Sequence, residues 1–245
     1  MASKTTSRCA AFSALVAIAA ALGMGSSAAS PPIVLPTVIQ EVPYTVWDAG
    51  AEGLDAVGSW LKVDPLVPAG AAFLPPYVHV HTFSFQGRAP GGSIALGYIG
   101  ESKVVGFGTF DAAGNPQQLT MPYEWHEGAN YFPLVYQPVP GVVAAAVHEA
   151  ETNSWTHVGS FAVPAEWGRL SSVSVTWSGS YAKRPACADF PVQSAQRLSP
   201  VGIVGDAVLV ASAAIASGKV AGDCIAQSTV LGDPPARALY LLGVP

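Results

Sequence analysis

The chain has 245 residues, of which 50% are hydrophobic and only 11% are charged, against roughly 25% charged in an average soluble domain. This composition excludes a disordered chain, which needs low hydrophobicity and high charge. The 25 glycines and 21 prolines argue against a mainly helical protein, because both residues destabilise helix interiors. We therefore expect turn-rich β structure.

The N-terminal residues have the order of a secretory signal. Lys4 and Arg8 precede an uncharged apolar run from Ala10 to Met24, and Ser27-Ala28-Ala29 supplies the small residues of a cleavage site. An uncleaved membrane anchor is the alternative, but a span needs about 20 apolar residues. We expect secretion, with a signal peptide over residues 1–29, an extended lead-in over 30–50 and a single β-sandwich domain over 51–245. No transmembrane segment is expected in the mature chain.

The charge balance bears on the partners. Cleavage after Ala29 leaves 9 basic and 16 acidic residues, a formal charge of −7. Nucleic-acid binding depends on Lys and Arg side chains that neutralise phosphates, and the longest basic stretch is the pair Lys183-Arg184. We therefore expect no nucleic-acid partner. Neutral partners, such as glycans or other proteins, fit a weakly charged exterior better.

The mature chain keeps two cysteines, Cys187 and Cys224. In an oxidising exterior such a pair predicts a disulfide, and a closed loop of about 38 residues corresponds to roughly 4 kcal/mol of stability. Two free thiols or a metal site are the alternatives. Without CxxC spacing or neighbouring histidines, the pair gives almost no indication of zinc.

Strand patterns recur every 8 to 12 residues, which is typical of sandwiches and barrels. The clearest is 77–85, and 93–99 with 103–110 forms a hairpin around a short Gly-containing turn. A loop of helix and strand breakers is expected over 86–92. The segment from Val208 to Ala216 is short and apolar; we expect a strand, with a helix as the alternative. The remaining expected strands are 37–46 (at a sheet edge), 58–63, 130–137, 142–149, 155–163, 170–177, 201–214, 225–231 and 238–242.

His79 and His81 are candidate metal ligands. On a strand they share one face, about 7 Å apart, and so could form half of a metal site. The spacing of the other histidines and carboxylates does not require a third ligand. The simpler interpretation places both rings on the exposed face of a half-buried strand, and we expect no metal and no cofactor.

Glu124 and Glu127 are candidate catalytic carboxylates. They flank Trp125, and a glycosidase needs two carboxyl groups about 5 to 9.5 Å apart. The alternative is a solvated loop between strands. The sequence contains neither a Gly-x-Ser-x-Gly elbow nor a phosphate-binding Gly-x-x-x-x-Gly-Lys motif.

Aromatic residues are the stronger indication of a binding site, because amphipathic rings near strand ends commonly contact carbohydrates or proteins. Alternatively, several of them belong to the core, and we expect at least half to be buried. The candidate ligand-binding residues are Trp125, Tyr131, Trp155, Trp167 and Tyr181.

An ordered set of motifs resembles uncharacterised secreted bacterial β-sandwich proteins that are related to concanavalin-like lectin folds. The set comprises GYIGESKVVGFGTFD from Gly97 to Asp111, Trp125-x-x-Gly128-x-x-Tyr131, a block from Thr152 to Pro164, and Cys187. The resemblance covers about residues 77–200 and implies an all-β, antiparallel two-sheet sandwich of jelly-roll type, without an established activity. The chain departs from it in an Ala/Gly/Ser-rich tail after Ser199, and it lacks the acidic cluster of a legume-lectin calcium site.

These observations predict a non-catalytic, extracellular protein that binds a glycan or a cell-surface protein, although fold analogy supplies much of this expectation. One alternative is a secreted hydrolase or lyase that acts on polysaccharide through Glu124, Glu127 or the two histidines. Another is a structural or host-interacting surface protein, which an exposed apolar patch would favour.

Overall fold

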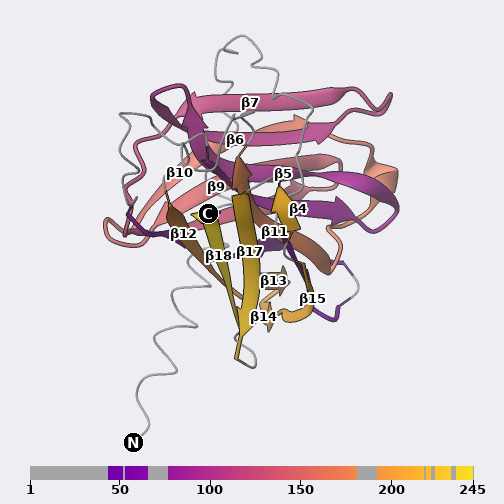
Figure 1. Cartoon of the computed structure of the whole chain (residues 1–245). Coiled ribbons are helices and arrows are strands. Elements are labelled where there is room, and N and C mark those ends of the chain that lie inside the picture. Colours follow the sequence, from indigo (N-terminus) through magenta and orange to yellow (C-terminus); the bar gives the residue numbers. More distant parts are fainter. Residues whose placement is uncertain are drawn as a thin grey trace, which may run out of the picture.

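The computed structural model describes residues 44–51, 53–65, 77–180, 192–217, 219–221, 224–232 and 236–244. They form two antiparallel sheets that face each other, with one short 3-10 helix at Ala165–Trp167 (Figure 1). The predicted all-β, two-sheet sandwich is confirmed. Within these residues, no helix has the length and apolar character needed to cross a bilayer. The predicted signal peptide and residues 30–43 of the lead-in lie outside the described part.

The first sheet has seven strands, and the N-terminal strand β1 lies inside it. β1 pairs with a strand on each side, so it is not the edge strand that the sequence suggested. In spatial order the strands are β15 (Ser212–Ser217), β1 (Tyr44–Asp48), β11 (Val173–Ser180), β4 (Tyr77–Phe85), β5 (Arg88–Ile99), β6 (Ser102–Phe110) and β7 (Pro116–Pro122).

The second sheet has eleven strands, and several neighbouring strands in it are far apart in the sequence. β9 (Val142–Glu149) pairs with β8, and β10 (Ser154–Ala162) pairs with β9. The remaining strands, in spatial order, are β14 (Ala207–Val210), β13 (Val201–Val204), β2 (Ala56–Gly58), β8 (Asn130–Val139), β3 (Leu61–Val63), β12 (Gln193–Leu198), β18 (Arg237–Val244), β17 (Cys224–Leu231) and β16 (Lys219–Ala221).

Several expected boundaries differ from those observed. The strand expected over 201–214 is three strands, β13, β14 and β15, so the segment from Val208 to Ala216 is extended and not helical. The predicted 58–63 strand is divided between β2 and β3. Strands β7, β12 and β16 were not predicted.

The breaker-rich loop expected over 86–92 is also mostly strand, because β5 begins at Arg88. The physical reason is close backbone packing. A Cβ atom at Gly91 would lie 2.0 Å from the carbonyl oxygen of Phe83, and one at Gly92 would lie 2.1 Å from that of Gly108. Glycine is required here by the neighbouring strands and does not mark a turn.

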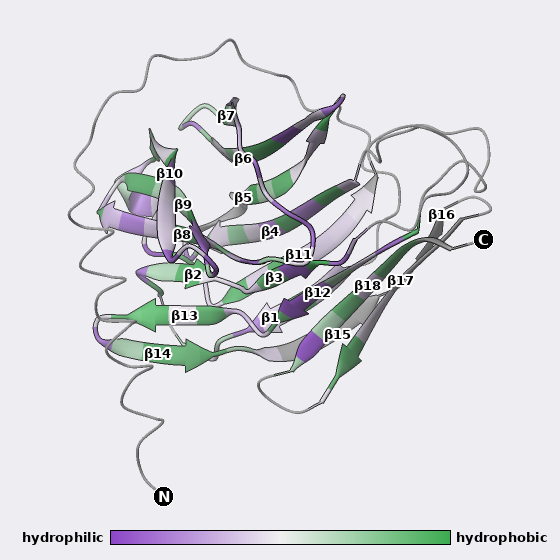
Figure 2. Ribbon diagram, turned by 90° about the vertical axis from the view of Figure 1, so that its left-hand side faces the viewer, coloured by the Kyte–Doolittle hydropathy of each residue, from purple (hydrophilic) through white to green (hydrophobic). Residues whose placement is uncertain are grey.

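Side chains alternate between the space between the sheets and the outer faces. In the half of the interior that β5, β6, β8 and β9 enclose, the buried residues are mainly apolar, among them Leu96, Phe107, Val135 and Val147. At the opposite end of the second sheet, β13 and β14 are continuously hydrophobic (Figure 2). β14 is an edge strand, and it exposes Val208 and Val210.

The apolar half of the interior should contribute most of the free energy of unfolding. Leu96 is fully buried in β5, so Leu96→Ala should lower the free energy of unfolding by about 2–5 kcal/mol. Val208→Ala, at an exposed position of an edge strand, should change it by less than about 0.5 kcal/mol. Urea denaturation of both variants measures the difference, and equal losses would contradict this description of the core.

Candidate functional site

A hollow of about 330 Å³ lies on the outer face of the eleven-stranded sheet. Two neighbouring rows of side chains form it. Lys62 pairs with Asn130 on one side and with Gln196 on the other, and Leu198 pairs with Arg237. The described residues that line the hollow are Trp60, Lys62, Asn130, Ala150, Gln196, Leu198 and Arg237.

Trp60 is the aromatic wall of the hollow, and its neighbours hold the indole in place. The backbone oxygen of Trp60 accepts a hydrogen bond from the amide of Leu198 at 3.1 Å. Its ring lies 5.1 Å from that of Phe132 and 5.8 Å from that of His148, with tilted and edge-on geometries. Gly58 leaves room for Phe132, because a Cβ atom there would lie 2.7 Å from the phenyl ring. The indole is thus partly exposed and firmly supported.

The amide side chains of the hollow are oriented by neighbouring carboxylates. Asn130 donates through Nδ2 to Glu151 at 3.4 Å, and Gln196 donates through Nε2 to Asp64 at 3.5 Å. These contacts engage the nitrogen of each amide, so the amide oxygens are available as acceptors for hydroxyl donors. The formal charges of Glu151, Asp64, Lys62 and Arg237 sum to zero. The hollow therefore combines an aromatic face, hydrogen-bonding amides and balanced charge.

Of the five aromatic residues predicted to bind a ligand, three are in the core. Trp125 is 0% exposed, Tyr131 1% and Trp167 4%, so a ligand cannot reach these rings, and the prediction for them is wrong. They are buried because rings of this size fill the space between the sheets, Trp125 next to His79 and Trp167 next to Phe85. Trp155 is partly buried and stacks on His148, which in turn contacts Trp60. Tyr181 lies outside the described residues.

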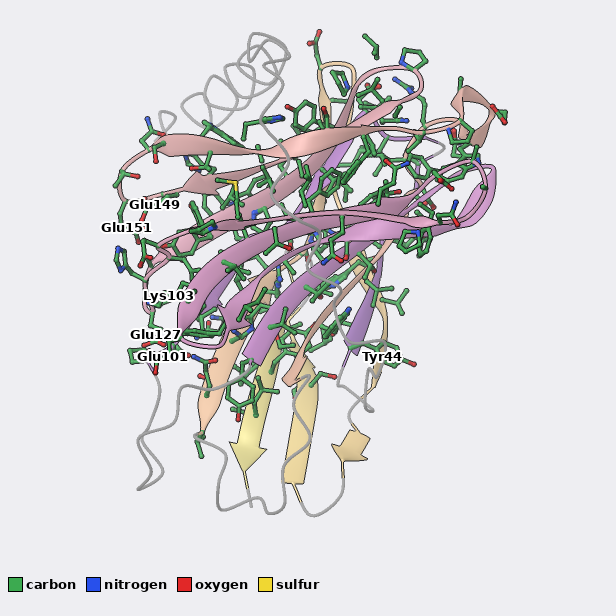
Figure 3. All side chains as sticks on the ribbon, turned by 90° about the horizontal axis from the view of Figure 1, so that it is seen from above. Tyr44, Glu101, Lys103, Glu127, Glu149 and Glu151 are labelled. Carbon is green, nitrogen blue, oxygen red and sulfur yellow. The ribbon has the colours of Figure 1, made fainter. Side chains whose placement is uncertain are left out.

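The predicted carboxylates Glu124 and Glu127 lie at one end of the sandwich. Figure 3 shows Glu127 on the same side as Glu101, Lys103 and Glu149, with Tyr44 on the opposite side. Glu127 accepts a hydrogen bond from the hydroxyl of Tyr98 at 2.9 Å. Glu124 is exposed, and among the described residues no hydrogen bond or ion pair joins it to Glu127. The two carboxylates are thus not assembled as a pair.

Glu149, which was not predicted, also accepts from a tyrosine at this end. Tyr131 donates to it at 3.2 Å, and Tyr131 in turn accepts from the backbone amide of His126 at 2.7 Å. Burial raises the pKa of Tyr131, and burial together with the charge of Glu149 raises the pKa of Tyr123 to about 12. The tyrosines therefore remain protonated donors, and these carboxylates serve to satisfy them.

His79 and His81 share one face of β4, as predicted, but that face is the interior of the sandwich. They are 0% and 1% exposed, so their expected position on a solvated face is wrong. Alternation along a strand does not reveal which face is buried when valines occupy the other positions. The Nδ1 atom of His79 lies 2.9 Å from the hydroxyl of Ser178, and that of His81 lies 3.4 Å from the hydroxyl of Ser59.

Burial and charge both keep these histidines neutral. Burial, followed by the nearby positive charge of Arg197, lowers the pKa of each to about 3 from the ordinary 6.5. The side chain of Gln193 acts in the opposite direction and raises the pKa of His79. Within the described residues, no group of three His, Cys, Asp or Glu side chains could hold a metal ion. Cys187 lies outside those residues, so the disulfide with Cys224 stays a prediction.

Trp60 lines the candidate site but was not predicted from the sequence. The segment GSWLKV was expected to be a strand, and on a strand Trp60 and Lys62 point to the same side, away from Leu61. A tryptophan that alternates with a buried leucine and shares its face with a lysine was the available indication of an exposed ring. The partners Gln196 and Arg237 could not be identified, because β12 and β18 are distant in sequence.

Comparison with known proteins identifies a shared fold. Neither a protein family nor a curated protein sequence matches the chain. A crystal structure of scytalido-glutamic peptidase with a transition-state analogue inhibitor is 9% identical, has a TM-score of 0.51, and is matched over 83% of this chain and 98% of that one. A second structure of this peptidase, with a peptide-based transition-state analogue, is 10% identical, has a TM-score of 0.50, and is matched over 82% of this chain and 98% of that one.

A winged bean acidic lectin bound to methyl-α-D-galactose is more distant. It is 7% identical over 82% of this chain and 76% of the lectin, with a TM-score of 0.38. At such identities the peptidase likeness shows the fold alone. The sandwich implied by the family resemblance is confirmed, whereas the relation to that family stays a prediction.

The buried histidines make stability depend on pH. Between pH 6.5 and about 3 the unfolded chain binds protons that the folded chain excludes. The free energy of unfolding should therefore fall as the pH falls through this window, by up to about 1.4 kcal/mol per pH unit for each histidine. Urea denaturation at pH 7, 6 and 5 measures the slope. His79→Gln and His81→Gln should each make it shallower, and unchanged slopes in both variants would contradict the assignment.

Proposed function

We propose that this protein is a secreted, non-catalytic module that binds a neutral glycan in the hollow beside Trp60. The observation that carries the proposal is the combination of a supported, partly exposed indole with oriented amides on one sheet face. Sugar rings offer apolar C–H faces that pack on aromatic side chains. Their hydroxyl groups donate to and accept from Asn, Gln, Lys and Arg side chains.

The charge balance supports a neutral ligand. Lys62 and Arg237 lie in the hollow, while Glu151 and Asp64 lie next to its two amides. A strongly acidic or basic polymer would meet one set of like charges at close range. Secretion, which the N-terminal sequence predicts, would bring such a module into contact with extracellular polysaccharide.

The position of the carboxylates favours binding over hydrolysis. The described residues that line the hollow include no Asp or Glu, and glycoside hydrolysis needs two carboxyl groups on opposite sides of the scissile bond. Glu127 and Glu149 are engaged by tyrosines at the sandwich end. The likeness to glutamic peptidases is a likeness in fold alone.

The proposal predicts retention on neutral glycans that depends on Trp60. On an array of neutral and uronic-acid-containing oligosaccharides, the protein should bind members of the neutral set. Trp60→Ala should weaken binding at least about tenfold, which corresponds to about 1.4 kcal/mol. Isothermal titration with the best array member measures the affinity and detects any hydrolysis product.

Trp177→Ala is the matched control. Trp177 is also partly exposed, but it lies on the outer face of the seven-stranded sheet, and its removal should leave the affinity unchanged. Equal losses in the two variants would place the ligand elsewhere. Binding confined to acidic glycans, or no binding at all, would overturn the proposal, and release of shorter sugars would favour the hydrolase instead.

A further inference from the structure

Arg197 places a positive charge between the two sheets. Its side chain is 0% exposed, although it projects from the same strand that contributes Gln196 to the outer hollow. Burial lowers its pKa only to about 10, so it is protonated at neutral pH. None of the hydrogen bonds and ion pairs among the described residues joins it to a carboxylate. A buried, unpaired charge is costly enough to require compensation.

The guanidinium has one edge occupied and one edge free. Nη1 donates to the hydroxyl of Ser59 at 3.0 Å. Nε and Nη2 are buried and have no hydrogen-bonding partner. These two nitrogens form one side of the planar group, and their N–H bonds run parallel. That edge matches the two oxygens of a carboxylate or a comparable oxyanion, which accept both hydrogens together.

Ser59 lies between Arg197 and His81. Because its oxygen accepts a hydrogen from Arg197, its own hydrogen is available for Nδ1 of His81, 3.4 Å away. A neutral His81 that accepts at Nδ1 carries its proton on Nε2. The Nε2 atom is buried and has no partner, and in that tautomer it is a further donor without an acceptor.

His79 lies two residues before His81 on β4, and its ring also contacts a serine hydroxyl. Its Nδ1 atom is 2.9 Å from the hydroxyl of Ser178. Its Nε2 atom and the Oε1 atom of the nearby Gln193 are both buried without a hydrogen bond of good geometry. Buried polar groups in proteins are nearly always hydrogen-bonded. Among the described residues, the Nε and Nη2 atoms of Arg197 have no hydrogen-bond acceptor. The missing partner is therefore one for the guanidinium edge.

We propose that the interior of the sandwich binds a small oxyanion, of the carboxylate class, against the free edge of Arg197 and beside His81 and His79. The anion would accept both hydrogens of the guanidinium edge and would neutralise its charge. The neutral imidazoles add donors without adding positive charge, so a single negative charge suffices. The site is distinct from the outer hollow, because Arg197 and Gln196 point to opposite faces of β12.

Formate and acetate are the probes, tested on the whole protein against sodium chloride of equal ionic strength at pH 7. The melting temperature should rise with the logarithm of the formate or acetate concentration, as expected for a ligand that binds the folded state. The ¹³C-NMR spectrum of labelled formate should show a bound signal that excess unlabelled acetate displaces. No bound signal, together with the same melting temperature in all three salts, would overturn the proposal and leave a hydrated cluster.

Arg197→Met and Arg197→Lys test the guanidinium edge, since the second variant keeps the charge but removes the paired donors. Both should lose the formate-dependent rise and the bound signal. If these variants do not fold, Ser59→Ala should still weaken formate binding. This variant removes the hydroxyl that contacts both Nη1 of Arg197 and Nδ1 of His81. His157→Gln, at an exposed position on β10, is the matched control and should respond like the unchanged protein. An undiminished response in every folded variant of Arg197 and Ser59 would contradict the site.

Discussion

The structure depends on the alternation of side chains across its strands, because each strand serves both the interior and an outer face. β12 illustrates the consequence. Its register against β3 and β18 is fixed by antiparallel pairing, and a shift of one residue would exchange its two sets of side chains. The inward set is Gln193, Ala195 and Arg197, and the outward set is Ser194, Gln196 and Leu198.

The interior is divided into two chemically different halves. Between β5, β6, β8 and β9 it is filled by aliphatic and aromatic side chains, which supply the hydrophobic stabilisation. Between β4, β11, β12 and β18 it contains His79, His81, Ser178, Arg197 and Tyr240, all buried. The hydroxyl of Tyr240 donates to the backbone oxygen of Thr176 at 2.8 Å, and burial raises its pKa. One half thus supplies the apolar core, whereas the other contains hydrogen-bonded polar groups together with the unpartnered nitrogens of His79, His81 and Arg197.

The scarcity of charge has a related consequence for the surface. With 11% charged residues, the outer faces carry mainly small, apolar and amide side chains, and the hollow beside Trp60 is balanced in charge. Long-range electrostatic attraction therefore contributes little to recognition. The proposed neutral glycan would instead be recognised by shape, ring packing and hydrogen bonds.

The sequence allowed the fold class and the most regular strands to be predicted. Tyr77–Phe85 and Val142–Glu149 were located to the residue, because apolar and β-branched residues dominate both. Strand β12 was not predicted, because its inward side chains include Gln193 and Arg197. Its polar sequence is typical of a loop. Burial also could not be foreseen for His79 and His81, because it is set by β12 and β18, far away in the chain.

The candidate site was predictable only in its parts. A strand at 58–63 was expected, and it carries Trp60 and Lys62, but nothing local indicates that Gln196 and Arg237 pack beside them. Trp125 and Tyr131 were expected to be accessible, and they fill the end of the core instead. A single sequence identifies residue types suited to recognition, whereas sheet pairing decides which of them face solvent together.

Chemical-shift mapping tests the central claim most directly. The ¹⁵N-labelled protein would be titrated with a neutral oligosaccharide that it binds, and the perturbed amide and indole signals assigned. The account predicts the largest changes at the indole of Trp60 and at the amides of Lys62 and Gln196. Perturbations centred on Trp177 or on the Tyr98–Glu127 end, with Trp60 unaffected, would contradict it.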